Sequence, residues 1–179
     1  YEIPLYIDGA RLGYGLMAEG NDITLPYLAR HCDVFYIGGT KIGALCGEAV
    51  VFTHKNAHKH FFSIQKQHGA VIAKGALIGL QFEALFTDDL YFKLSEQAIK
   101  TAMRMKALFI RKGFEFLVDS PTNQQFVIMD NEQAERLSRQ IRFTHFGQTD
   151  RYHTICRFVT SWATTDAELD ELERILSAR

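Results

Sequence analysis

A lysine in an unusual setting is the first residue of this sequence that could do chemistry. Lys41 lies in the glycine-bracketed segment Gly38–Gly43, directly after the apolar run 34–37, with no other charge nearby. A lysine that loses solvent has a depressed pKa and can act as a nucleophile, as a Schiff-base lysine must. Taken alone, the segment is more simply interpreted as a loop lysine beside a tight turn.

An aspartate upstream changes that interpretation. Asp8 ends the apolar run 3–7 and is followed by Gly9. By itself it would be a helix cap or the salt-bridge partner of Arg11, because a carboxylate ending an apolar strand is costly without a partner. Pyridoxal phosphate requires both residue types, a lysine for the imine and an acid that keeps the pyridine nitrogen protonated. Asp8 and Lys41 together therefore predict a site for this cofactor.

An arginine near the C-terminus is a third candidate. Arg157 is the only charge in the apolar run 155–159. A guanidinium in that setting needs an anion, and a substrate carboxylate can bind it through two hydrogen bonds. An internal ion pair with a residue such as Asp130 is an equally good interpretation from the sequence.

Composition narrows the class of protein. The 179 residues are 47% apolar and 23% charged, which is typical of a globular chain. The net charge of -1 gives no excess of positive charge that would indicate binding to nucleic acid or to an anionic membrane. No apolar run has the length of a membrane span. Cys32, Cys46 and Cys156 lie among apolar residues and are predicted to be reduced core cysteines of a cytoplasmic protein. Because the chain starts inside an apolar run, without methionine, we expect it to be the C-terminal portion of a longer protein.

The elements of the first half should bring Asp8 and Lys41 together. Apolar residues at 3–8 predict an interior strand of a parallel sheet, and a helix at 24–31 and a strand at 33–37 should follow. Such a strand–helix–strand unit places both candidates at one edge of the sheet. Another strand is predicted at 48–52. The histidine-rich segment 55–67 is interpreted as a solvated helix without a metal site, and the apolar segment 70–86 as a buried helix or a subunit interface.

A boundary at Thr87–Asp89 divides the chain into predicted domains at residues 1–90 and 91–179. The second domain begins with a long helix that Gly113 ends. Asn131 is expected to cap a second helix, and Thr165 with Glu168 forms a capping box for the last one. The predicted strands of this domain are 115–118, 125–130, 142–146 and 152–159.

Two motifs resemble a known family. The segment Leu5–Leu12 (Leu-Tyr-Ile-Asp-Gly-Ala-Arg-Leu), followed by Gly39–Ala44 (Gly-Thr-Lys-Ile-Gly-Ala), is similar to the threonine aldolases. These are pyridoxal-phosphate enzymes of the β-eliminating lyase group, with the aspartate aminotransferase fold. Arg157–Thr160 matches the arginine segment of the family. Thr40 departs from it, since many relatives have serine before the lysine. The resemblance covers nearly the whole chain, but only the second half of a family member.

The resemblance implies an α/β fold of the pyridoxal-phosphate-dependent transferase type (fold type I). The chain would contain the end of its large parallel or mixed-sheet domain and a small α+β C-terminal domain. Asp8 would pair with the pyridinium nitrogen and Lys41 would bond covalently to the cofactor. Arg11 would lie near the cofactor and the substrate carboxylate, which Arg157 would bind, and the Thr40 hydroxyl would contact the cofactor.

The activity implied is cleavage of a β-hydroxy-α-amino acid, such as threonine or allo-threonine, to glycine and an aldehyde. A β-eliminating lyase, which releases a keto acid and ammonia, would use the same residues. A third possibility is a non-catalytic fragment or interaction subunit, because no glycine/serine phosphate cup or ring-stacking aromatic is identifiable here. In the family these groups come from the N-terminal half. We also expect a cytoplasmic homodimer or homotetramer with shared active sites, acting on small amino acids, without a metal, nucleic acid or membrane partner.

Overall fold

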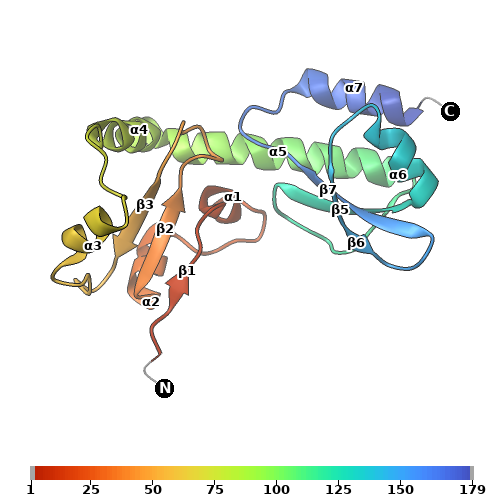
Figure 1. The fold of residues 1–179 in the computed structure, drawn as a ribbon. Helices are drawn as coiled ribbons and strands as arrows, with labels where there is room; N and C mark the ends of the chain where they lie inside the picture. Colours follow the sequence, from red (N-terminus) through yellow and green to blue (C-terminus); the bar gives the residue numbers. More distant parts are fainter. Residues whose placement is uncertain (1–2, 178–179) are drawn as a thin grey trace. The chain divides into compact units, whose positions relative to one another are not determined.

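The computed structural model describes residues 3–177 (Figure 1). Backbone proximity divides them into two compact units, each with its own sheet. The first unit contains the described residues up to Leu16 together with Asn21–Leu94, and the second contains Met17–Gly20 and the residues from Ser95 onward. None of the helices within residues 3–177 has the length and apolar character needed to span a bilayer.

The first unit is built on a three-stranded mixed sheet in the order β1-β2-β3. Its strands are β1 (Tyr6–Ile7), β2 (Val34–Gly38) and β3 (Glu48–Phe52). Strand β1 runs parallel to β2, and β3 runs antiparallel to it. The parallel pair confirms the predicted strand–helix–strand unit, and its connection contains α1 (Leu12–Leu16) and α2 (Leu25–His31). Parallel strands require such a crossover, because the chain must return to the starting end of the sheet before the second strand begins, and a tight turn is too short for that.

Local sequence explains why α2 begins where it does. The Thr24 side chain accepts a hydrogen bond from the Tyr27 N–H at 3.3 Å, and Pro26 occupies the first turn. Threonine at the cap satisfies an N–H that has no partner inside the helix, and proline there loses nothing by lacking one. In β2, Phe35 and Ile37 are buried, so the strand presents one apolar face to the core.

Two elements of this unit are more exposed within the described residues than an interior strand or a buried helix would be. Strand β1 lies at an edge of its sheet with Tyr6 exposed, because only β2 pairs with it among residues 3–177. The helix expected at 70–86 forms as α4 (Ala76–Phe86), but Leu85 is its only buried residue, and Leu77 is 61% exposed. Its alternative interpretation as a subunit interface stays a prediction.

The segment between β3 and α4 also differs from expectation. His54 lies in an exposed turn and His58 in an exposed irregular segment, and the helix α3 (Phe61–Gln67) begins only after them. The helix predicted at 55–67 is therefore shorter than expected and begins at Phe61. Cys32 and Cys156 are buried free thiols as predicted, whereas Cys46 is exposed, because the turn after Lys41 carries it to the surface.

The second unit packs helices against an antiparallel sheet in the order β4-β5-β7-β6. The strands are β4 (Glu115–Phe116), β5 (Gln124–Asp130), β6 (Thr144–Gln148) and β7 (His153–Val159). The helices are α5 (Leu90–Arg111), α6 (Asn131–Ser138) and α7 (Asp166–Ser177). Helix α5 begins in the first unit, directly after the short 3-10 helix η1 (Thr87–Asp89). The core lies where the apolar faces of these helices meet the sheet, around Phe109, Val127, Cys156 and Leu172.

The helix ends of this unit follow the sequence in most cases. Gly113, with φ of +79°, follows the end of α5 in the left-handed conformation that glycine adopts readily. The capping box of α7 forms, with the Thr165 N–H donating to Glu168 Oε2 at 2.7 Å and the Glu168 N–H to Thr165 Oγ1 at 3.3 Å. Asn131 is the first residue of α6 rather than its cap, because its side chain is used by Arg151 O and the Thr154 hydroxyl.

Candidate active site

The carboxyl ends of β1 and β2 bring the two predicted segments together. The Gly38 N–H, at the end of β2, donates to the Gly9 carbonyl at 2.9 Å, so the residue after Asp8 bonds to the start of the lysine turn. Parallel strands of an α/β sheet end at the same edge, which is where ligand sites form. The structure thus reproduces the predicted juxtaposition of Asp8 and the Lys41 turn.

Two glycines make this close approach possible. A Cβ atom added at Gly9 would lie 1.6 Å from the Tyr36 carbonyl oxygen, and one added at Gly38 would lie 2.5 Å from the Ala10 carbonyl oxygen. Both neighbours are backbone atoms, which cannot move aside without distorting the sheet. Glycine at these positions is therefore a condition for packing the Asp8 segment against the lysine turn.

The Asp8 carboxylate is held by two donors on one oxygen. The Tyr36 hydroxyl donates to Asp8 Oδ1, and the Ala10 N–H donates to the same atom at 3.0 Å. The Tyr36 bond, followed by the Ala10 bond, holds the pKa of Asp8 below its usual value, and the charges of Lys41 and Arg11 add smaller effects in the same direction. Asp8 is exposed to solvent and ionised at neutral pH.

The turn that carries Lys41 is bonded at successive backbone and side-chain groups. The Tyr91 hydroxyl donates to the Gly38 carbonyl at 3.1 Å, and the buried Tyr14 hydroxyl donates to the Lys41 carbonyl. From β3, Glu48 Oε2 accepts the Gly39 N–H at 2.8 Å. These bonds fix the backbone on both sides of Lys41, whose side chain is half-buried. A nucleophile on a constrained backbone needs less reordering to meet its partner.

The Thr40 hydroxyl has a partner inside the chain. It donates to Glu48 Oε1 at 3.3 Å. A hydroxyl has a single hydrogen to donate, so a bond from Thr40 to an anionic group of a cofactor would require this one to break. The predicted contact of Thr40 with the cofactor stays a prediction.

Arg11 lies at the start of the segment that follows Asp8, just before α1, and is half-buried. Its Nε atom is buried and has no hydrogen-bond partner in the structure. A buried guanidinium nitrogen without a partner loses free energy that an anionic ligand could restore. The position therefore suits the predicted role beside an anionic ligand.

Arg157 lies in β7 of the second unit. Its guanidinium makes only long bonds, from Nη1 to Gln124 Oε1 and from Nη2 to Thr144 Oγ1, both at 3.4 Å, and its buried Nε has no partner. No carboxylate of residues 3–177 forms an ion pair with it. The predicted alternative, a pair with Asp130, is wrong, because Asp130 faces His153, four residues along β7. The charge remains available to an anion.

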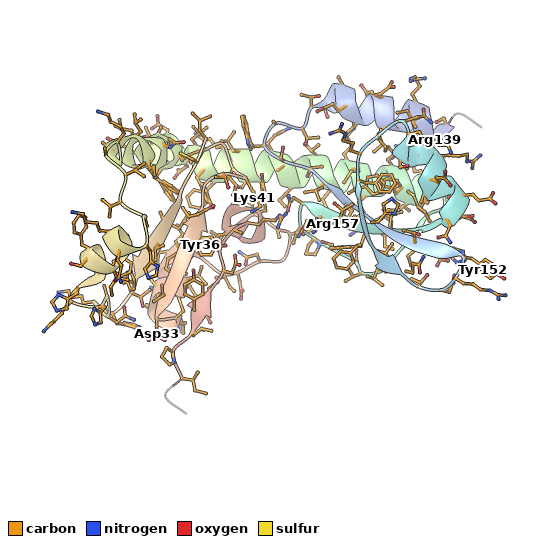
Figure 2. All side chains as sticks on the ribbon, viewed as in Figure 1. Asp33, Tyr36, Lys41, Arg139, Tyr152 and Arg157 are labelled. Carbon is orange, nitrogen blue, oxygen red and sulfur yellow. The ribbon has the colours of Figure 1, made fainter. Side chains whose placement is uncertain are left out.

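The residues that position the site were not anticipated from the sequence. Tyr14, Tyr36, Glu48 and Tyr91 each bond to the Asp8 segment or to the lysine turn. Of these four residues, only Glu48 has a recognisable sequence signal, since it is a charged residue at the start of an otherwise apolar predicted strand. Figure 2 labels Tyr36 on β2 and Lys41 in the turn after it.

The residues of the first unit fit pyridoxal phosphate. Lys41 offers an amine on a constrained backbone, Asp8 has an ionised carboxylate whose Oδ2 makes no hydrogen bond within the described residues, and Arg11 has a buried nitrogen without a partner. The cofactor requires an amine for its aldehyde, an anion for its pyridine nitrogen and cations for its acidic groups.

Comparison with known proteins gives one consistent result. No profile of a known protein family matches the chain. The low-specificity L-threonine aldolase of Pseudomonas aeruginosa is 26% identical over 173 residues, which cover 95% of this chain and 49% of that protein. The solved threonine aldolase of Leishmania major is 36% identical with a TM-score of 0.93, over 97% of this chain and 51% of that one.

More distant solved structures share the fold. Serine palmitoyltransferase from S. paucimobilis, solved with bound PLP, has a TM-score of 0.60 at 14% identity, over 97% of this chain and 46% of that one. The chain thus spans about half the length of the relatives it matches. The chain therefore has the fold type I architecture and is similar, in sequence and structure, to the C-terminal portion of threonine aldolases.

Proposed function

We propose that this chain is the C-terminal part of a pyridoxal-phosphate-dependent aldolase that cleaves a β-hydroxy-α-amino acid of the threonine or allo-threonine type to glycine and an aldehyde. The observation that carries the proposal is the bond from the Gly38 N–H to the Gly9 carbonyl at 2.9 Å, which joins the Asp8 segment to the lysine turn. The similarity to threonine aldolases supports the reaction class.

Each residue would have a defined task. Lys41 would be the residue that holds the cofactor through its amine. Asp8 keeps a proton on the pyridine nitrogen through an ionic hydrogen bond. Arg157 binds the substrate carboxylate, for which its guanidinium is not engaged by any carboxylate of the described chain. Arg11 neutralises an anionic group of the cofactor or the substrate.

The bound cofactor supplies an electron sink for the pair of electrons left on Cα. Cleavage breaks the Cα–Cβ bond, transfers the β-hydroxyl proton to a base and returns a proton to Cα. Glycine and the aldehyde then account for every atom of the substrate. The base is not among the residues assigned in this chain.

We further propose a cytoplasmic homodimer or homotetramer in which residues 1–90 belong to a large cofactor-binding domain and 91–179 to a small one. Large apolar side chains exposed on and before α4 support an interface there, and these are Phe62, Val71, Ile72, Leu77 and Leu80. The molar mass of the purified protein by light scattering tests the assembly, and a monomer at all concentrations would exclude it.

The test of cofactor binding is the visible absorbance of the full-length protein with pyridoxal phosphate. We expect a yellow band that borohydride abolishes, leaving the reduced cofactor attached to the peptide that contains Lys41. The Lys41→Ala variant should lose the band, whereas Lys66→Ala, an exposed lysine of α3, should keep it. A full-length protein that stays colourless would overturn the proposal.

The products decide which reaction occurs. Threonine and allo-threonine should yield glycine and an aldehyde in equal amounts. Formation of a keto acid and ammonia instead would assign β-elimination. A protein that binds the cofactor but converts neither amino acid would be a non-catalytic member of the fold.

A further inference from the structure

Tyr36 makes a contact that a structural tyrosine would not need. It lies in β2 and is half-buried, with its ring centroid 6.3 Å from that of Tyr6 on β1. A phenylalanine would pack equally well in that position. The hydroxyl is used for one bond, in which it donates to Asp8 Oδ1.

The two donors to Asp8 converge on one oxygen. Oδ1 accepts both the Tyr36 hydroxyl and the Ala10 N–H, the latter at 3.0 Å. A carboxylate oxygen has two lone pairs, so Oδ1 is saturated. The second oxygen, Oδ2, makes no hydrogen bond within residues 3–177, and the side chain is exposed. The pair of donors therefore fixes the carboxylate plane and leaves Oδ2 as its one available acceptor.

We infer that Tyr36 is a positioning residue, which together with the Ala10 N–H holds the Asp8 carboxylate so that Oδ2 alone faces the pyridine nitrogen of the cofactor. The inference rests on the proposed function, because it assigns the acid of that site an orienting partner. A bond from Tyr36 on β2 and a bond from the backbone two residues after Asp8 together restrict the Asp8 rotamer more than either could alone. Tyr36 is not itself expected to touch the cofactor.

The directions of the pKa changes of Asp8 and Tyr36 agree with this role. The Tyr36 bond is the largest cause of the lowered pKa of Asp8, ahead of the Ala10 bond and the charges of Lys41 and Arg11. The same bond raises the pKa of Tyr36 to about 12, and Glu48 on β3 and Tyr6 on β1 face its hydroxyl with smaller effects in the same direction. The hydroxyl therefore stays a donor, and the carboxylate stays an anion, over the neutral range.

The test is the Tyr36→Phe variant of the full-length protein, with Tyr6→Phe as its matched control. The first readout needs no activity, and is the titration of the Asp8 carboxyl carbon by NMR in protein freed of cofactor. In Tyr36→Phe the Asp8 pKa should rise toward its ordinary value, whereas in Tyr6→Phe it should stay as in the wild type. An Asp8 titration that is the same in Tyr36→Phe and the wild type overturns the inference.

The second readout is kinetic and separates positioning from folding. With the cofactor bound, Tyr36→Phe should keep the visible band, lose about tenfold in kcat, and lose activity at a higher pH than the wild type on the acid side. Its KM should change little, because the substrate carboxylate is bound elsewhere. An unchanged pH profile would overturn the role even if kcat fell.

A double-mutant cycle distinguishes an effect of Tyr36 that acts through Asp8 from a general effect on the fold. In an Asp8→Asn background, Tyr36→Phe should add little to the loss of cofactor affinity, because both changes remove the same interaction. Additive losses would mean that Tyr36 acts through the fold, and would overturn the inference. A wild-type protein without the visible band would overturn the proposed function and this role together, whereas a wild-type band with an unmoved Asp8 titration in Tyr36→Phe overturns only the role of Tyr36.

Discussion

Tyr91 and Gly38 are 53 residues apart in the chain, yet the Tyr91 hydroxyl donates to the Gly38 carbonyl at 3.1 Å. The same hydroxyl accepts the Gly13 N–H, also at 3.1 Å. Tyr91 is completely buried, and burial raises the pKa of its hydroxyl well above the usual value, although the Gly13 bond opposes the rise. One hydroxyl thus ties the start of α5 to α1 and to the turn that carries Lys41.

Replacing Tyr91 with phenylalanine should therefore destabilise the protein by about 1–3 kcal/mol, because the Gly13 N–H and the Gly38 carbonyl lose a buried partner. Urea unfolding of the full-length protein measures the change. Tyr27→Phe is the control, since Tyr27 is 42% exposed on α2 and its ring contact with His31 would remain. Equal unfolding midpoints for Tyr91→Phe and the wild type would contradict the prediction.

A methyl group at Gly9 should be poorly tolerated. The added Cβ would lie 1.6 Å from the Tyr36 carbonyl oxygen, so β1 and β2 would have to separate at the site. We expect Gly9→Ala to cost roughly 3 kcal/mol or more and to abolish covalent cofactor binding.

Gly15 offers the matched comparison for that change. It lies in α1 with nothing within 4 Å of an added Cβ. Gly15→Ala should leave cofactor binding intact and stabilise the protein by about 0.5–1 kcal/mol, because alanine loses less backbone entropy in a helix. Thermal unfolding of both variants gives the comparison, and a Gly9→Ala protein as stable as the wild type would refute the steric argument.

Arg157 should matter for substrate affinity more than for stability. If its guanidinium binds the substrate carboxylate through two hydrogen bonds, Arg157→Lys keeps the charge but loses the fork geometry, and KM should rise by about tenfold or more. The affinity for glycine, followed through the visible spectrum, should fall in parallel. Arg139→Ala, which removes an exposed partner of Glu135, should change neither value. A normal KM in Arg157→Lys would remove this arginine from the binding site.

The capping box of α7 should make stability depend on pH. Hydrogen bonds from the Thr165 N–H and then the Thr165 hydroxyl lower the pKa of Glu168. A lowered pKa means that the stabilisation is fully present above the unfolded-state pKa and is lost as pH falls through the folded-state value. The advantage of the wild type over Glu168→Gln in urea unfolding should therefore shrink on acidification.

Removing the other half of that box tests the cap directly. Thr165→Ala should cost about 1 kcal/mol at neutral pH, because the first turn of α7 loses the oxygen that accepts the Glu168 N–H. A wild-type advantage over Glu168→Gln that grows toward acid pH would refute the assigned direction of the pKa change.

Short-range patterns in the sequence predicted most of the elements. Thr24 identified the start of α2, Gly113 the end of α5, and Thr165 with Glu168 the start of α7. Each signal depends on atoms within a few residues, which is why the sequence alone contains it. The meeting of Asp8 with the Lys41 turn was also predictable, because parallel strands end at the same edge of a sheet.

What the sequence could not determine depends on contacts between distant residues. The bonds of Tyr91, Tyr36 and Glu48 to the site come from other elements, and such pairings leave no periodic pattern along the chain. Apolar character alone likewise did not reveal that, among residues 3–177, β1 lies at an edge of its sheet and α4 is mostly exposed, since burial depends on which surfaces meet. The sequence by itself thus determined which groups are candidates for the chemistry, whereas only the tertiary structure decided which groups hold them in place, because hydrogen-bond partners are set by the packing of whole elements.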